Sequence, residues 1–112
     1  MTYALYSDDL FWSSKIIETA KALGHAVVRA KSLGEVEKLA PDVLIVDLNT
    51  RDVDVTALRA AAPAAKLRAF GRHTDEEGLA RARAAGCEPV LPRSALQAKL
   101  PEYLGEWLGK RV

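Results

Sequence analysis

Two stretches of the sequence decide the fold: YALYSDD (residues 3–9) and VLIVDL (residues 43–48). Each contains a run of apolar residues with the composition of a β-strand, and each run is followed by carboxylates. Two such strands, side by side and parallel, lie about 4.8 Å apart. Their C-terminal ends would bring Asp8, Asp9 and Asp47 into one crevice, where open α/β sheets bind their ligands. Carboxylates this close repel one another unless a proton or a cation lies between them, so this crevice is the candidate site.

Strand and helix patterns alternate along the whole chain. Strand patterns cover residues 3–7, 25–30, 42–47, 66–70 and 89–91, with helical patterns between and after them. This alternation predicts an α/β fold, a flavodoxin-like doubly wound sheet of five parallel strands with helices on both faces. Pro101 predicts a kink or a split in the last helix. Capping boxes are predicted to begin three of the helices, at Ser32–Glu35, Thr74–Glu77 and Ser94–Gln97.

The composition is that of an ordinary globular domain. The chain has 112 residues, enough for a single domain (residues 1–112), with 49% hydrophobic residues and 28% charged residues. The net charge of +1 gives no indication of binding to nucleic acid or to a membrane surface. Cys87 is the single cysteine, and its small neighbours predict a buried hydrophobic residue. The sequence shows neither a signal peptide nor a membrane span, so we expect a cytoplasmic protein.

Over nearly its whole length, the chain resembles the receiver (CheY-like) domain of bacterial two-component response regulators. The resemblance rests on the acidic pair in YSDD (residues 6–9), the strand VLIVDL (43–48), the helix pattern at residues 75–86, and LPRS (91–94) after the fifth strand. It implies a stand-alone receiver-like domain whose parallel sheet has the strand order 2-1-3-4-5.

The resemblance also implies a chemistry for the crevice. Asp47 would accept a phosphoryl group, while Asp8, Asp9, Asp47 and the backbone carbonyl of Asn49 would hold Mg²⁺. The metal would neutralise charge during in-line transfer. Arg93 takes the position of a phosphate-binding lysine, and this exchange changes the geometry of the contact.

Other positions depart from the receiver pattern. Gly71 stands where receivers carry a Ser or Thr hydroxyl, Val90 stands where they carry a switching aromatic residue, and Thr50-Arg51 replaces a Met-Pro pair. The elements implied for metal binding are therefore kept, while those that report phosphorylation are lost.

These departures favour a degenerate receiver that acts by regulated protein–protein interaction and is not an enzyme. Its partner would be a histidine kinase or a downstream signalling protein, and a homodimer through the fourth and fifth helices is a further expectation of the resemblance. A working phospho-accepting response regulator, with Mg²⁺-dependent phosphorylation of Asp47, is the alternative. A small flavodoxin-like ligand-binding protein or enzyme is the third hypothesis, but the sequence has no glycine-rich phosphate loop to support it.

Simpler interpretations stand beside these. Asp8 or Asp9 could cap the first helix, and Asp47 with Asn49 could begin a turn. Phe11 and Trp12 could form a first helical turn with one ring buried, or a surface for a partner. Arg72 and His73 could simply belong to a solvated loop, although Arg72 could also contact a phosphate. His25 and Trp107 are interpreted as structural residues.

Overall fold

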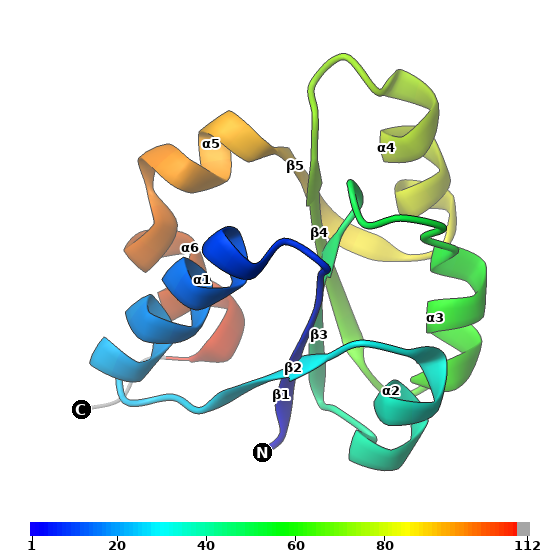
Figure 1. Cartoon of the computed structure of the whole chain (residues 1–112). Coiled ribbons are helices and arrows are strands. Elements are labelled where there is room, and N and C mark those ends of the chain that lie inside the picture. Colours follow the sequence, from blue (N-terminus) through cyan, green and yellow to red (C-terminus); the bar gives the residue numbers. More distant parts are fainter. Residues whose placement is uncertain (110–112) are drawn as a thin grey trace.

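A computed structural model describes residues 1–109 and shows one parallel sheet with helices on both sides (Figure 1). The sheet order is β2-β1-β3-β4-β5, so the predicted order and fold class are confirmed. Tyr6 at the end of β1 pairs with Val46 near the end of β3, which places the two acidic strand ends side by side. The strands are β1 (Tyr3–Tyr6), β2 (Val27–Ala30), β3 (Val43–Asp47), β4 (Lys66–Gly71) and β5 (Cys87–Pro92).

The helices form two layers around this sheet. One layer, on the left of Figure 1, contains α1 (Leu10–Ala22), α5 (Arg93–Ala98) and α6 (Leu100–Leu108). The other layer contains α2 (Leu33–Leu39), α3 (Val55–Ala61) and α4 (Glu76–Ala84). None of the helices within residues 1–109 is both long and apolar enough to span a membrane.

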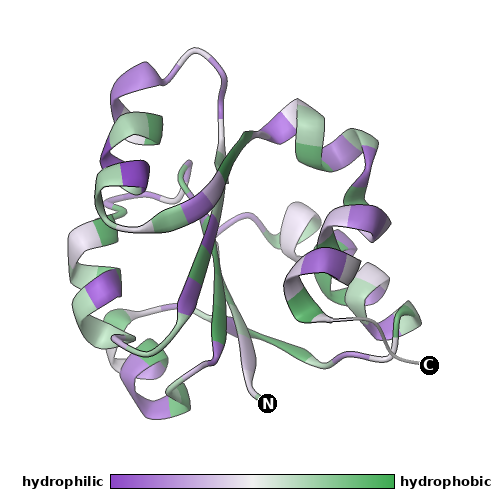
Figure 2. Ribbon diagram, turned by 180° about the vertical axis from the view of Figure 1, so that it is seen from behind, coloured by the Kyte–Doolittle hydropathy of each residue, from purple (hydrophilic) through white to green (hydrophobic). Residues whose placement is uncertain are grey.

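Each layer packs on its own face of the sheet and makes its own hydrophobic core. Successive strand residues point to opposite faces, so Leu5 and Ile45 join the core under α1, while Ala4 and Leu44 join the core under α2 and α3. Both faces are covered, which is why the central strand β3 has four successive apolar residues before Asp47, whereas hydrophilic residues interrupt other strands (Figure 2). Cys87 is buried in the second core as predicted, and burial raises the pKa of its thiol.

Two of the three predicted capping boxes are wrong. At Ser32 the predicted cap is confirmed, because the Ser32 hydroxyl accepts the N–H of Glu35 at 3.2 Å, while the Glu35 carboxylate reaches back one residue further than predicted and accepts the N–H of Lys31 at 2.6 Å. At α4 the cap is Asp75 and not Thr74: the Asp75 carboxylate accepts the Gly78 N–H at 3.0 Å, and it lies where a Cβ at Gly78 would collide with it. The box predicted at Ser94 does not form, because β5 passes directly into α5 at Arg93 and leaves no linker residue to act as the cap.

Pro101 splits the last helical segment in two, as predicted. The first part, α5, ends at Ala98, and α6 begins at Leu100. Pro101 thus lies in the first turn of α6, where its missing N–H breaks no helical hydrogen bond.

Two buried side chains, from β1 and from the segment before β2, are hydrogen-bonded to the end of α6. The Tyr3 hydroxyl donates to the Leu108 carbonyl at 2.8 Å. His25 is 8% exposed, its Nε2 lies 2.7 Å from the Gly109 carbonyl oxygen, and its ring meets Tyr3 edge-on. The structural interpretation of His25 is therefore confirmed. Regular strand pairing begins only at Val27, opposite the first residue of β1 and two residues later than predicted.

Candidate functional site

Asp47 is enclosed at the carboxyl edge of the sheet. It is the last residue of β3, and it is only 1% exposed. Its Oδ2 accepts the Ser7 hydroxyl at 2.7 Å, and its Oδ1 accepts the Asn49 N–H at 2.9 Å. Burial raises the pKa of the Asp47 carboxyl above its usual value, although these two hydrogen bonds act in the opposite direction. The fold therefore delivers Asp47 to the predicted edge, but as a buried and hydrogen-bonded group.

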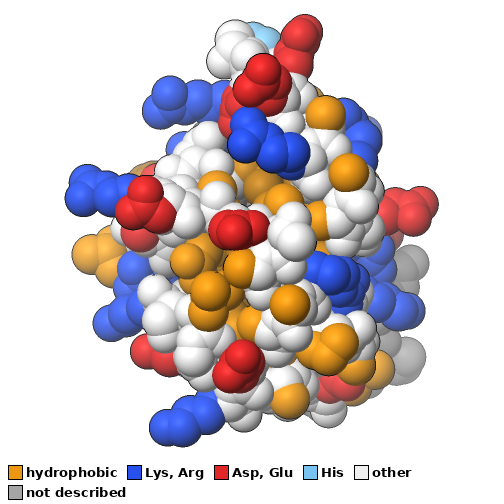
Figure 3. All heavy atoms as spheres, turned by 90° about the vertical axis from the view of Figure 1, so that its right-hand side faces the viewer, with side chains coloured by type: hydrophobic (Ala, Val, Ile, Leu, Met, Phe, Trp, Pro, Cys, Tyr) orange, Lys and Arg blue, Asp and Glu red, His pale blue; other side chains and the backbone are white. Residues whose placement is uncertain are grey.

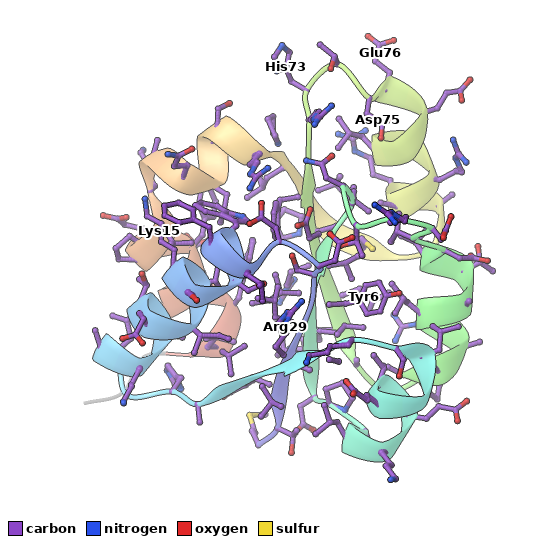
Figure 4. The ribbon with its side chains drawn as sticks, viewed as in Figure 1. Tyr6, Lys15, Arg29, His73, Asp75 and Glu76 are labelled. Atoms are coloured by element: carbon purple, nitrogen blue, oxygen red, sulfur yellow. The ribbon has the colours of Figure 1, made fainter. Side chains whose placement is uncertain are left out.

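Ser7 was given no role by the sequence patterns, and it is central to this edge. It follows β1 directly, is 2% exposed, and joins β1 to the end of β3 through Asp47. Its backbone carbonyl accepts the Nε–H of Arg29 on β2 at 2.9 Å. Figure 4 shows Arg29 and Tyr6 on opposite sides of the end of β1. Ser7 could have been found from the sequence, because it lies between the apolar run of the first strand and the acidic pair.

Asp9 performs two structural tasks at once. Its Oδ1 accepts the Trp12 N–H at 2.9 Å, which caps α1, and its Oδ2 accepts an N–H of Arg93 at 2.7 Å. The Trp12 backbone N–H, followed by the Arg93 hydrogen bond, holds the pKa of the Asp9 carboxyl below its usual value. The interpretation of this residue as a helix cap is therefore confirmed, and both carboxylate oxygens already have a donor.

Arg93 is held by a ring as well as by a carboxylate. Its guanidinium carbon lies 5.2 Å from the centre of the Trp12 ring. Trp12 is 2% exposed and packs edge-on against Phe70, with the ring centres 6.0 Å apart. Lys15, labelled on α1 in Figure 4, places its ammonium 5.7 Å from the same ring. Phe11, which precedes Trp12 in the sequence, is 79% exposed. Of these two neighbouring aromatic rings, that of Trp12 is therefore buried and that of Phe11 is in contact with solvent.

Asp8 and Asn49 complete the predicted set. Asp8 is exposed, and its Oδ2 accepts the backbone N–H of Arg51 at 3.0 Å. Asn49 is partly buried beside Asp47. Within residues 1–109, no three His, Cys, Asp or Glu side chains come together as a group that could hold a metal ion. The predicted residues therefore share one edge of the sheet, yet their carboxylates are each engaged by protein donors, and the predicted Mg²⁺ site stays a prediction.

Little space is left for a side chain at position 71, because Leu48 lies directly against Gly71. A Cβ at Gly71 would lie 3.0 Å from the Cβ of Leu48 and 3.3 Å from its Cδ1. Leu48 is 7% exposed, and its N–H donates to the Phe70 carbonyl at 2.9 Å, so it is fixed in place. The space that a Ser or Thr side chain would need is thus partly occupied by Leu48, which the sequence patterns did not single out.

Two other surfaces near this edge offer less chemistry. His73 lies at the tip of the loop between β4 and α4, turned to solvent in Figure 4, and Arg72 is also exposed, which supports the interpretation of a solvated loop. A groove between the start of α3 and α4 lies on the face shown in Figure 3, where apolar side chains appear between scattered charges. Its residues Asp54 and Asp75 cap α3 and α4, which accounts for their presence there.

Comparison with known proteins identifies this fold. No protein-family model and no curated protein matches the sequence. A response regulator from Burkholderia pseudomallei, described with a phosphorylated aspartic acid, a calcium ion and citrate, is 18% identical with a TM-score of 0.68, over 94% of this chain and 69% of that one. A CheY-like receiver domain protein from Methanospirillum hungatei is 17% identical with a TM-score of 0.71, over 96% and 95%. The beryllofluoride-activated NtrC4 receiver domain dimer is 17% identical with a TM-score of 0.69, over 95% and 98%.

These similarities cover nearly the whole chain and agree with the strand order. The protein therefore has the receiver (CheY-like) fold, as the sequence resemblance implied. At these identities the likeness shows the fold alone, so the function has to come from the residues of the site.

Proposed function

We propose that this protein is a receiver-like signalling domain that acts by binding another protein, without Mg²⁺-dependent phosphoryl transfer to Asp47. The observation that carries the proposal is the enclosure of Asp47, which is 1% exposed with both oxygens accepting hydrogen bonds from the protein. A cytoplasmic location and the absence of enzymatic activity belong to the same proposal.

Phosphoryl transfer depends on positioning and charge neutralisation more than on covalent chemistry. The acceptor oxygen must be reachable in line with the leaving group, and cations must neutralise the incoming phosphate. Here the acceptor is buried, the metal-ligating group is not assembled among the described residues, and Leu48 crowds the position of the hydroxyl. All three features work against the transfer step.

Protein binding is supported by an exposed apolar pair beside the crevice. Leu10 and Phe11 begin α1, directly after Asp9, and are 67% and 79% exposed. A large exposed aromatic residue is a frequent anchor in protein interfaces. A downstream signalling protein or a histidine kinase that contacts this corner would also sense the crevice, because Trp12 of the same helical turn packs beneath Arg93. Dimerisation is a further proposal, supported by the NtrC4 neighbour that is described as a dimer, and the fourth and fifth helices are the face that the sequence resemblance implies for it.

Intact-mass measurement after incubation with acetyl phosphate and Mg²⁺ tests the proposal. We expect the mass of the wild-type protein to stay unchanged, as in Asp47→Asn. A gain of about 80 Da, one phosphate, in the wild type alone would contradict it. The control is a functional receiver domain treated in parallel, which must show the gain.

The second candidate function is a working phosphoacceptor. Two observations favour it: Asp47 ends β3 at the carboxyl edge of the sheet, and a structural neighbour is described with a phosphorylated aspartic acid. The same mass measurement separates the two functions. No specific observation favours the third hypothesis, a small ligand-binding protein or enzyme.

A further inference from the structure

The crevice contains a cation that belongs to the chain itself. Arg93 donates to Asp9 at 2.7 Å and lies against the ring of Trp12, between the start of α1 and the start of α5. An ion pair at this distance is a charge-assisted hydrogen bond, which is stronger than a neutral one. An arginine guanidinium is a planar cation. It therefore supplies positive charge at the place where the resemblance predicts a metal.

The carboxylates leave little room for a second cation. Both oxygens of Asp9 are in use, one for the α1 cap and one for Arg93. A metal bound to Asp9 would have to share an oxygen with the α1 cap or with Arg93, and the positive charge of Arg93, 2.7 Å from Oδ2, would repel it. Asp47 is likewise engaged through both oxygens, by Ser7 and by the Asn49 N–H.

Arg93 is held in this position from several sides. It is the first residue of α5 and follows β5 without a linker, so its backbone is fixed by both elements. Its side chain is 32% exposed, and Trp12 beneath it is in turn packed against Phe70 of β4. The Trp12 ring and the Asp9 carboxylate together fix the Arg93 guanidinium, so the fold itself determines where this charge lies.

We propose that Arg93 is the resident counter-cation of the crevice and takes the place of a divalent metal. The crevice is then stable without Mg²⁺, and removal of the Arg93 side chain opens a site for a divalent metal ion. This inference deepens the proposed function and rests on its receiver-like interpretation of the crevice.

Thermal unfolding with increasing MgCl₂, at ionic strength matched with NaCl, tests the inference on three proteins. The wild type should show no Mg²⁺-specific rise in Tm. Arg93→Gln should melt lower in the absence of Mg²⁺, and its Tm should rise with Mg²⁺ and saturate, because a ligand that binds the folded state alone stabilises it. Arg83→Gln removes the same charge from an exposed position on α4 and should behave as the wild type.

Two results overturn the inference. One is a saturable rise in the Tm of the wild type with Mg²⁺, which would show that the metal binds beside Arg93. The other is an Arg93→Gln protein that folds and does not respond to Mg²⁺, which would show that Arg93 does not keep a metal out. No phosphate donor is present, so neither result decides whether Asp47 can be phosphorylated, and the mass measurement remains independent.

A second measurement covers the case in which Arg93→Gln unfolds. Paramagnetic Mn²⁺ added to the ¹⁵N-labelled wild type should leave the amide signals of Asp9 and Leu10 unbroadened. Selective broadening of these two signals in the wild type would overturn the inference.

Discussion

Replacement of Asp47 by asparagine should stabilise the folded protein at neutral pH. Asp47 is 1% exposed and receives two hydrogen bonds, whereas an ionised carboxylate offers about four acceptor positions. The asparagine side chain is nearly the same size. Its oxygen can still accept the Asn49 N–H, and the Ser7 hydroxyl can rotate to accept from the new amide. The substitution therefore removes a buried charge and keeps the local hydrogen bonding.

The size of the gain follows from two opposing contributions. An ion removed from water costs several kcal/mol in a protein interior. Against this, each of two charged hydrogen bonds becomes neutral and loses about 1 kcal/mol. We expect a net gain of about 1–2 kcal/mol, within the range of single stabilising substitutions. For a domain of this size the gain corresponds to a rise in Tm of about 4–8 °C.

The pH dependence of this gain has a definite sign. Burial raises the pKa of Asp47 in the folded state above the reference value of 3.8. The folded state therefore binds its proton more tightly than the unfolded chain does, so this residue favours folding below pH 3.8 and loses that contribution as pH rises through the folded-state pKa. An asparagine amide does not titrate, so the advantage of Asp47→Asn over the wild type should grow with pH and level off above that pKa.

Urea unfolding of both proteins between pH 3.5 and pH 7.5, about the range of carboxyl titration, measures the difference directly. Asp52→Asn is the matched control, since Asp52 is exposed with a φ of 57°, a conformation that asparagine tolerates, and its effect should be small at every pH. A variant Asp47→Asn that is less stable than the wild type at pH 7, or a difference that does not change with pH, would refute the reasoning.

Three further substitutions test separate parts of the structure. Tyr3→Phe leaves the Leu108 carbonyl without its donor and should cost about 1–2 kcal/mol in urea unfolding; an unchanged midpoint would contradict the hydrogen bond. Gly71→Ser crowds Leu48 and should cost about 1–3 kcal/mol while adding no phosphorylation by mass; a stabilised variant would show that Leu48 yields freely. Phe11→Ser should change stability by less than about 0.5 kcal/mol and weaken binding to a partner once one is isolated; a large loss of stability would show that the ring packs in the core.

The strands could be predicted because their sequence signals are short-ranged and recur along the chain. Apolar runs between turn residues mark each strand, and the resemblance to receivers supplies the order in which they pair. Asp47 reaches the carboxyl edge because it directly follows four apolar strand residues, a pattern visible in the sequence alone. The helix starts were harder to predict, because a Ser or Thr with an acidic residue three positions later matches a capping box even where Asp75 caps better.

The arrangement inside the crevice could not be predicted from spacing. Asp9 pairs with Arg93 across 84 positions of sequence, and no local pattern shows that contact. The same residue also caps α1, a local role that competes with metal binding for its oxygens. Leu48 and Gly71 form another such pair, in which the small residue is understood only once its neighbour is known.

The position of Trp12 gives the crevice an optical readout. Its indole lies beneath Arg93 and against Phe70, so its emission depends on whether that guanidinium stays in place. The only other tryptophan, Trp107, lies near Tyr103 on α6, and Trp107→Phe would leave Trp12 as the sole indole. In that variant, any ion, phosphate donor or partner that moves Arg93 would change the fluorescence of a native residue, and binding at the crevice could be followed in real time without a label.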